Sequence, residues 1–297
     1  MKSFKISKKK SLKPLMQGYP LSPNASITDK YKKKLKNLVN RMSNETEKVI
    51  SNFFKSGLSK EYISYQDSLE SSQRISFDES LSSQAKIILN KLKNKYKKIF
   101  NEKSISYADE MLEDSNFANK KSTELSFKLL SGGIGIKTAL ESNGISEVIS
   151  SARNENVSLI QSIYSQYFTN IDGDVMRGIS SGSITQMNEN ILKRGSMTER
   201  RAKNIADDQT KKVYNNLNKQ RMQSQGLNKY IWRHSAGGQN PRQDHIDMDG
   251  NVYSFDDPPI IDKNTGERGI PGQAINCRCF MVPVIEFEDE EEIKNAA

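Results

Sequence analysis

Apolar residues recur at intervals of three, four or seven along much of this 297-residue chain, and this spacing limits what the chain can fold into. Side chains at such intervals lie on one face of an α-helix and can be buried together. Three runs show the pattern: Ile27, Tyr31, Leu35, Leu38, Met42, Val49 and Phe53; Leu81, Ala85, Ile88, Leu92, Tyr96 and Ile99; and Ile145, Val148, Ala152, Leu159, Ile163 and Tyr167. We therefore expect an elongated helical region over residues 27–226.

Local signals subdivide this helical region. The glycine-rich stretch from Ser131 to Lys137 indicates a loop or a helix break. Ser196 and Glu199 have the S-x-x-E spacing of a capping box, and Gly226 is a typical helix stop. The last helix of the region is therefore predicted to begin near Ser196 and to end at Gly226.

The sequence pattern changes after Gly226. The segment LNKYIWRHS favours a strand, and CRCFMVPVIEF favours a final strand. Between them, Asp249-Gly250 separates two short alternating segments and predicts a hairpin turn, followed by a loop rich in proline and glycine. The predicted fold class is mainly α, with a compact C-terminal α+β domain over residues 227–286.

Composition restricts the class of protein. Hydrophobic residues make up 35% of the chain and the mean hydropathy is −0.72, so we expect a highly solvated protein or one partly covered in an assembly. No apolar run approaches the roughly 20 residues that cross a bilayer, so no membrane partner is expected. Two cysteines form no disulfide framework, which favours a reducing compartment such as a cytoplasm.

Charge is concentrated at the two ends of the chain. Residues 1–50 hold 13 Lys and Arg and three acids, so they carry a net charge of +10 while the remaining residues sum to −1. Residues 1–26 are predicted to be an extended basic arm, and residues 287–297 an acidic tail. Such an arm would bind a polyanion or an acidic protein face, or simply be a solvated leader. The candidate binding residues are Lys2, Lys5, Lys8, Lys9, Lys10, Lys13, Lys32, Lys33 and Lys34.

A metal site is one interpretation of the C-terminal domain. The chain's two histidines and two cysteines, His234, His245, Cys277 and Cys279, all fall in this domain, and zinc prefers four such ligands. However, two cysteines separated by one residue do not form the usual C-x-x-C arrangement. Catalysis is a second interpretation, with Cys277 as nucleophile, His245 as base and Asp244 or Asp249 as its orienting group. That spacing matches no motif of known mechanism.

A structural role is the interpretation that we favour for these residues. Trp232 is the only tryptophan and is predicted to anchor a small core with Phe255, Phe280 and Val282. Gly250 would supply a positive φ in a tight turn. Arg242 and Arg278 would tie down the carbonyls and acids of the long loop (Asp256, Asp257 and Asp262), with His245 as a hydrogen-bonded linker.

Taken together, these residues resemble a known family, the phage minor head proteins, also called Mu F-like or phage head morphogenesis proteins. The resemblance is carried by an ordered series over about 55 residues. The series comprises Tyr230, Trp232, His234-Ser235, Pro241-Arg242, His245, Asp249-Gly250, Phe255, Pro258-Pro259, Pro271-Gly272 and Asn276-Cys277-Arg278-Cys279. The match is weaker upstream and is absent from the N-terminal arm.

This resemblance implies a virion protein of low copy number that is not an enzyme and needs no cofactor. The implied partners are the portal protein, the major capsid or scaffolding protein, and packaged double-stranded DNA. The implied location is the capsid interior or the neck, with the host cytoplasm occupied during assembly. DNA binding through the basic arm alone, and a Cys–His or metal-dependent hydrolase, are the alternative functions.

Many members of that family carry a C-x-x-C before the Asp-Gly and an H-P-N-C-R-C after it, which implies a zinc site in those members. This chain has Arg242 and His245 in place of the first two cysteines, and Ala274 in place of the histidine. We therefore expect no complete metal site here. His245 and Cys277 remain the candidate ligands, and arginine and hydrogen bonds are expected to brace the loop instead.

Overall fold

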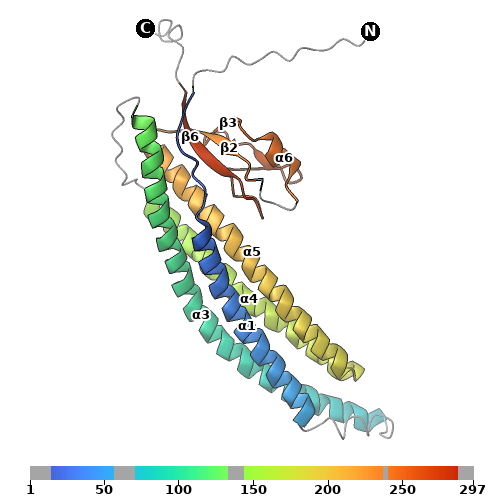
Figure 1. Cartoon of the computed structure of the whole chain (residues 1–297). Coiled ribbons are helices and arrows are strands. Elements are labelled where there is room, and N and C mark those ends of the chain that lie inside the picture. Colours follow the sequence, from blue (N-terminus) through green and yellow to red (C-terminus); the bar gives the residue numbers. More distant parts are fainter. Residues whose placement is uncertain (1–14, 57–70, 133–143, 237–239, 287–297) are drawn as a thin grey trace, which may run out of the picture. The chain divides into compact units, whose positions relative to one another are not determined.

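The computed structural model describes residues 15–56, 71–132, 144–236 and 240–286 (Figure 1). Two compact units are present. We call Asn24–Ser115 with Ile149–Val213 the helical unit, and Met1–Pro23, Asn116–Val148 and Tyr214–Ala297 the sheet unit. Three long helices, α3, α4 and α5, contribute to both units, so the units do not follow a single division near residue 226. The acidic tail, and Lys2 to Lys13 of the predicted arm, lie outside the described residues.

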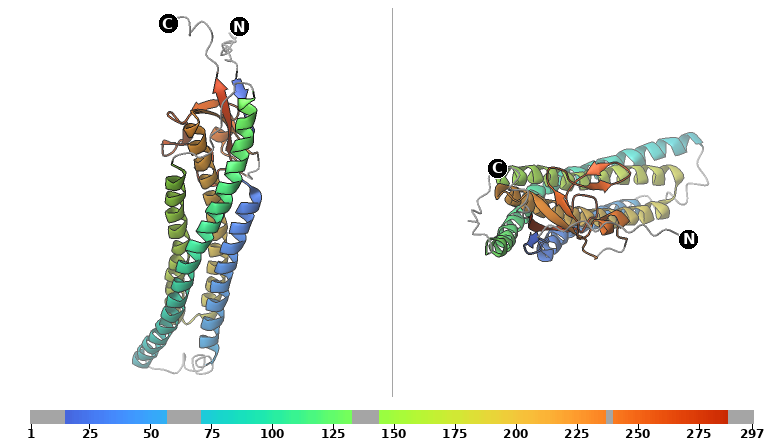
Figure 2. Two further views of the ribbon diagram at one scale, coloured as in Figure 1. Left: turned by 90° about the vertical axis from the view of Figure 1, so that its left-hand side faces the viewer. Right: turned by 90° about the horizontal axis from the view of Figure 1, so that it is seen from above.

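The helical unit is built from α1 (Ala25–Ser56), α3 (Ser71–Ser131), α4 (Ile145–Ser181) and α5 (Ile184–Ser224). Their segments in this unit lie side by side in both views of Figure 2. The periodic residues face its interior as predicted, because Tyr31, Tyr96 and Tyr167 are all buried. The mainly helical fold class is therefore confirmed, and none of the described helices has the length and hydropathy of a membrane span.

The predicted start of the last helix near Ser196 is wrong. α5 begins at Ile184, and Ser196 lies inside it, where its Oγ donates a hydrogen bond to the carbonyl of Leu192 at 3.3 Å. Glu199 forms ion pairs with two lysines on the helix surface instead of capping a helix end. An S-x-x-E pair on an exposed helix face has the same sequence spacing as a cap. The predicted stop is confirmed, because Gly226 follows α5 with a φ of +74°.

The sheet unit contains an antiparallel sheet of order β1-β6-β2-β3 (Figure 1). Its strands are β1 (Leu15–Gln17), β2 (Lys229–Arg233), β3 (Val252–Ser254) and β6 (Phe280–Glu286). A separate pair, β4 (Ile260–Asp262) and β5 (Glu267–Arg268), forms within the predicted loop. The two long predicted strands are confirmed. The sequence did not predict that β1, from the N-terminal arm, pairs with β6.

The predicted hairpin at Asp249-Gly250 is wrong. The residues before it form a short helix, α6 (Gln243–Asp247), where a hairpin would have its first strand. The strand after it, β3, pairs with β2 instead. Asp249 Oδ1 accepts a hydrogen bond from the backbone N–H of His234 at 2.9 Å. Gly250 has the expected positive φ, +79°, and its N–H donates to the carbonyl of Trp232. The Asp-Gly pair therefore fixes the end of α6 against β2.

The core of the sheet unit forms around Trp232, which is fully buried. Its cluster includes Phe255, as predicted, together with both cysteines and Met281. Val282 does not join this core, because it packs with other β-sheet residues in a separate cluster, and Phe280 is only half-buried. Successive residues of a strand point to opposite faces, which places Met281 and Val282 on different sides of the sheet.

Candidate functional site

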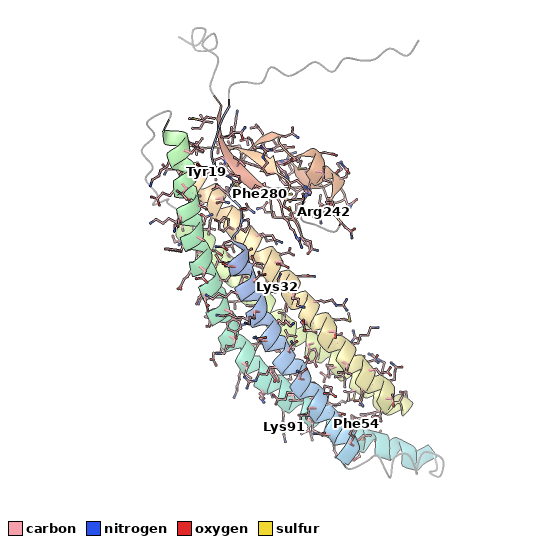
Figure 3. The ribbon with its side chains drawn as sticks, viewed as in Figure 1. Tyr19, Lys32, Phe54, Lys91, Arg242 and Phe280 are labelled. Carbon is pink, nitrogen blue, oxygen red and sulfur yellow. The ribbon has the colours of Figure 1, made fainter. Side chains whose placement is uncertain are left out.

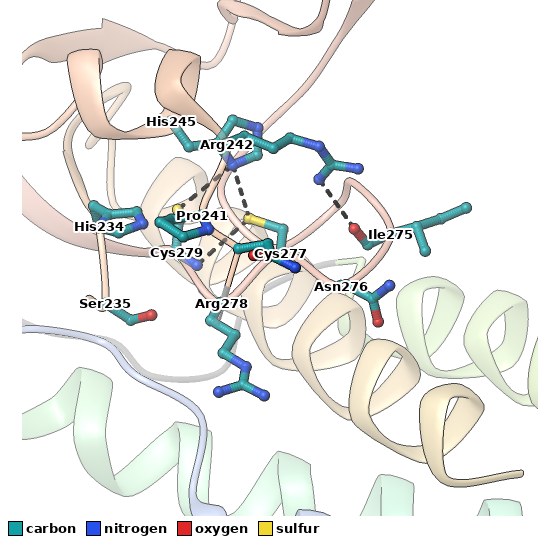
Figure 4. A pocket seen from close by; sticks show the side chains of 11 residues that line it. His234, Ser235, Pro241, Arg242, His245, Ile275, Asn276, Cys277, Arg278 and Cys279 are labelled. Atoms are coloured by element: carbon teal, nitrogen blue, oxygen red, sulfur yellow. Dashed lines mark hydrogen bonds between the residues drawn. The ribbon is translucent and has the colours of Figure 1, made fainter. Parts of the chain in front are cut away.

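His245, Cys277 and Cys279 form a buried cluster in the sheet unit (Figure 4). The exposed fractions of these residues are only 3%, 4% and 2%. His245 Nδ1 lies 3.4 Å from the sulfur of Cys277 and 3.7 Å from the sulfur of Cys279. The three ligand atoms all lie within 4.8 Å of one another. The structure thus adds Cys279 to the two candidate ligands that the sequence indicated.

The imidazole of His245 is oriented by its surroundings. α6 carries it into the core, where Nε2 lies 3.0 Å from the carbonyl oxygen of Ile261. A carbonyl only accepts hydrogen bonds, so Nε2 carries a proton and Nδ1 is directed at the sulfurs. The indole of Trp232 packs edge-on against the ring, with centroids 5.3 Å apart. Carbonyl, indole and sulfurs together leave the ring a single orientation.

The two cysteines lie in the loop before β6, not on the strand as predicted. Asn276 has a φ of +60°, which is uncommon for a residue other than glycine, and it turns the chain into this loop. The N–H of Cys277 bonds the carbonyl of Ala274 at 2.9 Å, and the N–H of Cys279 points at the Cys277 sulfur at 3.4 Å. This turn directs both sulfurs towards His245.

Electrostatic coupling within the cluster favours a thiolate on Cys277. A hydrogen bond from the Cys279 thiol lowers the pKa of Cys277 to about 4, assisted by one from His245 and opposed by burial. In return, Cys277 raises the pKa of His245 and, together with burial, that of Cys279. The cluster therefore holds one negative sulfur between the thiol of Cys279 and the ring of His245, and donation from Nδ1 to this sulfur requires a proton on both ring nitrogens.

These donors fit a thiophilic metal such as zinc. Zinc bonds of about 2.3 Å to sulfur and 2.1 Å to nitrogen imply tetrahedral ligand separations of roughly 3.6–3.8 Å. The nitrogen–sulfur distances of 3.4 and 3.7 Å in the cluster are close to those values. Soft thiolate and imidazole ligands also select zinc over magnesium or calcium. His245, Cys277 and Cys279 would hold the ion, which leaves one tetrahedral position for a ligand from outside this set.

A cavity of about 200 Å³ adjoins the cluster (Figure 4). Its lining includes the three cluster residues themselves, together with Pro241, Arg242, Arg278 and His234. His234 is not one of the three clustered ligands, and its Nδ1 accepts a hydrogen bond from the N–H of Ala236 at 3.2 Å. Ala236 has a φ of +52°, so a second uncommon backbone conformation lies beside this cavity.

The predicted bracing arginines have only partly the expected partners. Arg242 donates to the carbonyl of Ile275 at 3.0 Å, as expected for a group that ties down a loop. The loop acids have other partners, since Asp257 pairs with Arg268 and Asp256 accepts a hydrogen bond from Asn228.

The prolines of the series lie where the backbone turns or makes close contacts. Pro241 precedes α6, and the carbonyl of Pro259 accepts a hydrogen bond from Gly269 at 3.0 Å. Pro271 is buried next to Gly272, whose φ of +83° brings the backbone against Asn215 of α5. These contacts hold the loop that ends in the two cysteines.

The described lysines of the predicted basic set lie on α1, in the helical unit. Lys32 pairs with Asp207 of α5 at 2.8 Å, and Lys34 pairs with Glu110 of α3. Lys33 is exposed. Two of these three lysines therefore form ion pairs with acids of the same chain. The count of charges along the sequence did not indicate this.

The C-terminal part of the chain is similar to known proteins. Residues 169–282 match the family model described as "Phage Mu protein F like protein". An uncharacterized protein of Haemophilus influenzae is 31% identical over 55% of this chain and 35% of its own length. The uncharacterized protein YqbB of Bacillus subtilis is 33% identical over 24% of this chain and 28% of its own length. The chain thus spans about a third of the length of these relatives.

No solved structure matches the chain. The matched residues run from within α4, through all of α5 and the buried cluster, to Val282 in β6. They include every residue of the series from Tyr230 to Cys279, so the resemblance expected from the sequence is confirmed over this part. Residues 169–282 are thus similar to the phage Mu protein F-like family.

Proposed function

We propose that this chain is a minor head protein of a tailed phage and acts in head morphogenesis. The observation that carries the proposal is the family match over residues 169–282, which contains the complete His–Cys–Cys cluster and the loop that holds it. A protein of this kind is a structural component of the virion, located in the capsid interior or at the neck. It would pass through the host cytoplasm during assembly.

The portal protein is the proposed partner, with the major capsid or scaffolding protein as further contacts. Exposed apolar residues on the sheet-unit part of α3 support a protein partner. Phe117, Leu125 and Leu129 are 75%, 53% and 43% exposed. Intervals of eight and four residues bring them to one side of the helix, with exposed Lys121 between the first two, and large apolar side chains exposed together are typical of an interaction surface.

Burial of the cluster supports bracing as its role. A catalytic thiol has to meet its substrate, whereas both cysteines and the histidine here are only 2–4% exposed, although they lie at the wall of the cavity of about 200 Å³. The cluster joins α6 to the loop before β6, two segments that share no backbone ladder. Such a brace would make the sheet unit rigid, and a rigid unit is suited to docking on a partner.

Co-expression tests the proposal directly. The full chain is expressed with the portal protein of the same phage genome, and co-purification at moderate salt is expected. A variant with Phe117→Ser and Leu125→Ser should lose this association, while a control with Ile87→Ser and Leu192→Ser on the helical unit should keep it. Mass spectrometry of purified virions should find the protein at a copy number near that of the portal ring. Its absence from virions would refute the proposal.

A thiol hydrolase is the second candidate, because Cys277 and His245 are in contact at 3.4 Å and the pKa of Cys277 is low. Such an enzyme would lose all activity in Cys277→Ser. An activity screen with ester and peptide substrates on the full chain decides between the two functions, since a structural protein shows no Cys277-dependent turnover.

A further inference from the structure

Charge is strongly segregated along α3 in the helical unit. Residues 80–101 contain six lysines and no acid. The next stretch, residues 102–114, contains five acids and a single lysine. The chain-wide count of charges does not reveal this division, because the two stretches nearly cancel. Which of these charges are neutralised inside the protein is decided by the fold.

The acidic stretch of α3 is used internally. Lys30 of α1 contacts Glu110 and Asp114, both at 2.8 Å, and Arg153 of α4 contacts Asp109 at 2.5 Å. In this way the fold neutralises much of the positive charge of α1. Basic α1 therefore offers less free charge to a partner than its sequence suggests.

The basic stretch of α3 is neutralised much less. Lys95 pairs with Glu45 of α1, and Lys86 and Lys93 interact electrostatically with Asp172 of α4. The other three lysines, Lys91, Lys97 and Lys98, are exposed and form no ion pair with any residue that the structure describes. Figure 3 labels Lys91 on this part of α3.

These three lysines share one side of the helix with exposed amides. At 3.6 residues per turn, Asn90, Asn94 and Asn101 run along the middle of a sector about 120° wide, with Lys91 and Lys98 at one edge and Lys97 at the other. All six residues are exposed, whereas Leu89, Leu92, Tyr96 and Phe100 on the opposite side are buried. We call Asn90, Lys91, Asn94, Lys97, Lys98 and Asn101 the lysine face.

We propose that the lysine face binds the phosphate backbone of double-stranded DNA. Ammonium groups supply charge, and amide N–H groups donate hydrogen bonds to phosphate oxygens, which together give binding without base recognition. The face extends for about 16 Å along the rigid helix at 1.5 Å per residue. The inference rests on the proposed function for its source of duplex DNA, because packaged DNA is the polyanion that a head protein meets.

The chemistry of the face favours DNA over an anionic membrane. Helices that bind a lipid surface place an apolar strip beside their lysines, and the strip inserts among the acyl chains. Within residues 90–101 the residues between the lysines are asparagines, which gain nothing from an apolar phase, and the exposed apolar side chains on this side, Ile87 and Ile105, lie beyond the two ends of the face. No acid lies within residues 90–101, and the nearest one, Glu102 at the border of the face, forms an ion pair with Lys103.

The test is binding of the full chain to a 30-base-pair DNA duplex of mixed sequence. Fluorescence anisotropy measures the binding constant at a series of salt concentrations. The variant Lys91→Gln, Lys97→Gln, Lys98→Gln should bind at least about tenfold more weakly at 0.1 M salt. Its slope of log K against log salt should be shallower by roughly 2–3, because each phosphate contact contributes about 0.9.

A matched control removes the same charge elsewhere. Lys120→Gln, Lys121→Gln, Lys193→Gln changes three exposed lysines that form no ion pair within the described residues. This control should retain the wild-type slope within about one unit. Equal losses in the two triple variants would overturn the proposal. So would binding to phosphatidylglycerol vesicles but not to the duplex, or complete loss of DNA binding on deletion of residues 2–14 alone.

Portal co-purification of the same variants separates this inference from the proposed function. The lysine-face variant should still associate with the portal protein. If portal association fails for the wild-type chain while the DNA result holds, the proposed function is wrong and the DNA-binding face stands.

Discussion

His245 Nδ1 lies 3.4 Å from the sulfur of Cys277, across a loop that separates them by 32 positions in the sequence. Because Cys279 is 3.7 Å from the same nitrogen, one imidazole contacts both thiols of the chain. The contact joins α6 to the loop before β6. The cluster is also the candidate metal centre of the sheet unit.

Zinc binding is the first prediction. Protein purified from zinc-supplemented medium should contain about one zinc per chain, since three soft ligands are gathered at suitable separations. Cys279→Ser should lower the zinc content severalfold, and His234→Ala should not, because His234 is outside the ligand set. Elemental analysis measures the content. Equal zinc in wild type and Cys279→Ser would contradict the assignment of Cys279 as a ligand.

The second prediction concerns Asp174 in the helical unit. Its side chain is 2% exposed and accepts a hydrogen bond from Arg194 at 2.7 Å, and it also contacts Arg177. Asp174→Asn should lower the free energy of unfolding by about 3–5 kcal/mol, because it leaves a partly buried arginine without its partner. Asp29→Asn is the control, since Asp29 is 75% exposed and pairs weakly with Lys32. The control should change stability by less than about 1 kcal/mol in urea unfolding.

The same carboxylate predicts a pH dependence. Burial alone would raise the pKa of Asp174, but hydrogen bonds from Arg194 and Arg177 outweigh it, so its pKa lies below the ordinary value. A carboxylate with a lowered folded-state pKa stabilises the protein above its unfolded pKa of about 4, and this contribution is lost as the pH falls through the folded value. The stability difference between wild type and Asp174→Asn should therefore shrink below about pH 4. A difference that stays constant down to pH 2 would contradict the ion pairs.

Gly272 provides the fourth prediction. Its φ of +83° disfavours any side chain, and a Cβ at this position would collide with the amide of Asn215. Gly272→Ala should lower the free energy of unfolding by about 2–4 kcal/mol, as strain and steric overlap add. Gly226→Ala is the matched control, because it has a similar φ of +74° and open space around it. Its cost should be only about 1 kcal/mol, as measured by chemical denaturation.

Sequence periodicity predicted the helices of this protein because their signal is local. Tyr31, Tyr96 and Tyr167 belong to three separate runs, and each is buried where the 3.6-residue repeat places it. Strand β2 followed from the aromatic and branched residues around Trp232. Two predictions based on short motifs were wrong, because Ser196-x-x-Glu199 and Asp249-Gly250 are used in other ways once neighbouring segments supply their partners.

The positions of charges and sulfurs required the tertiary structure. The sequence alone determined which faces are apolar, where α5 stops and which family segment 169–282 resembles, since each depends on residues close together in the chain. Only the folded structure brought Cys279 to His245, paired Lys30 with Glu110, and left Lys91, Lys97 and Lys98 without an ion pair to any described residue. Those relationships depend on distances between helices and loops that are far apart in sequence, and no local pattern encodes them.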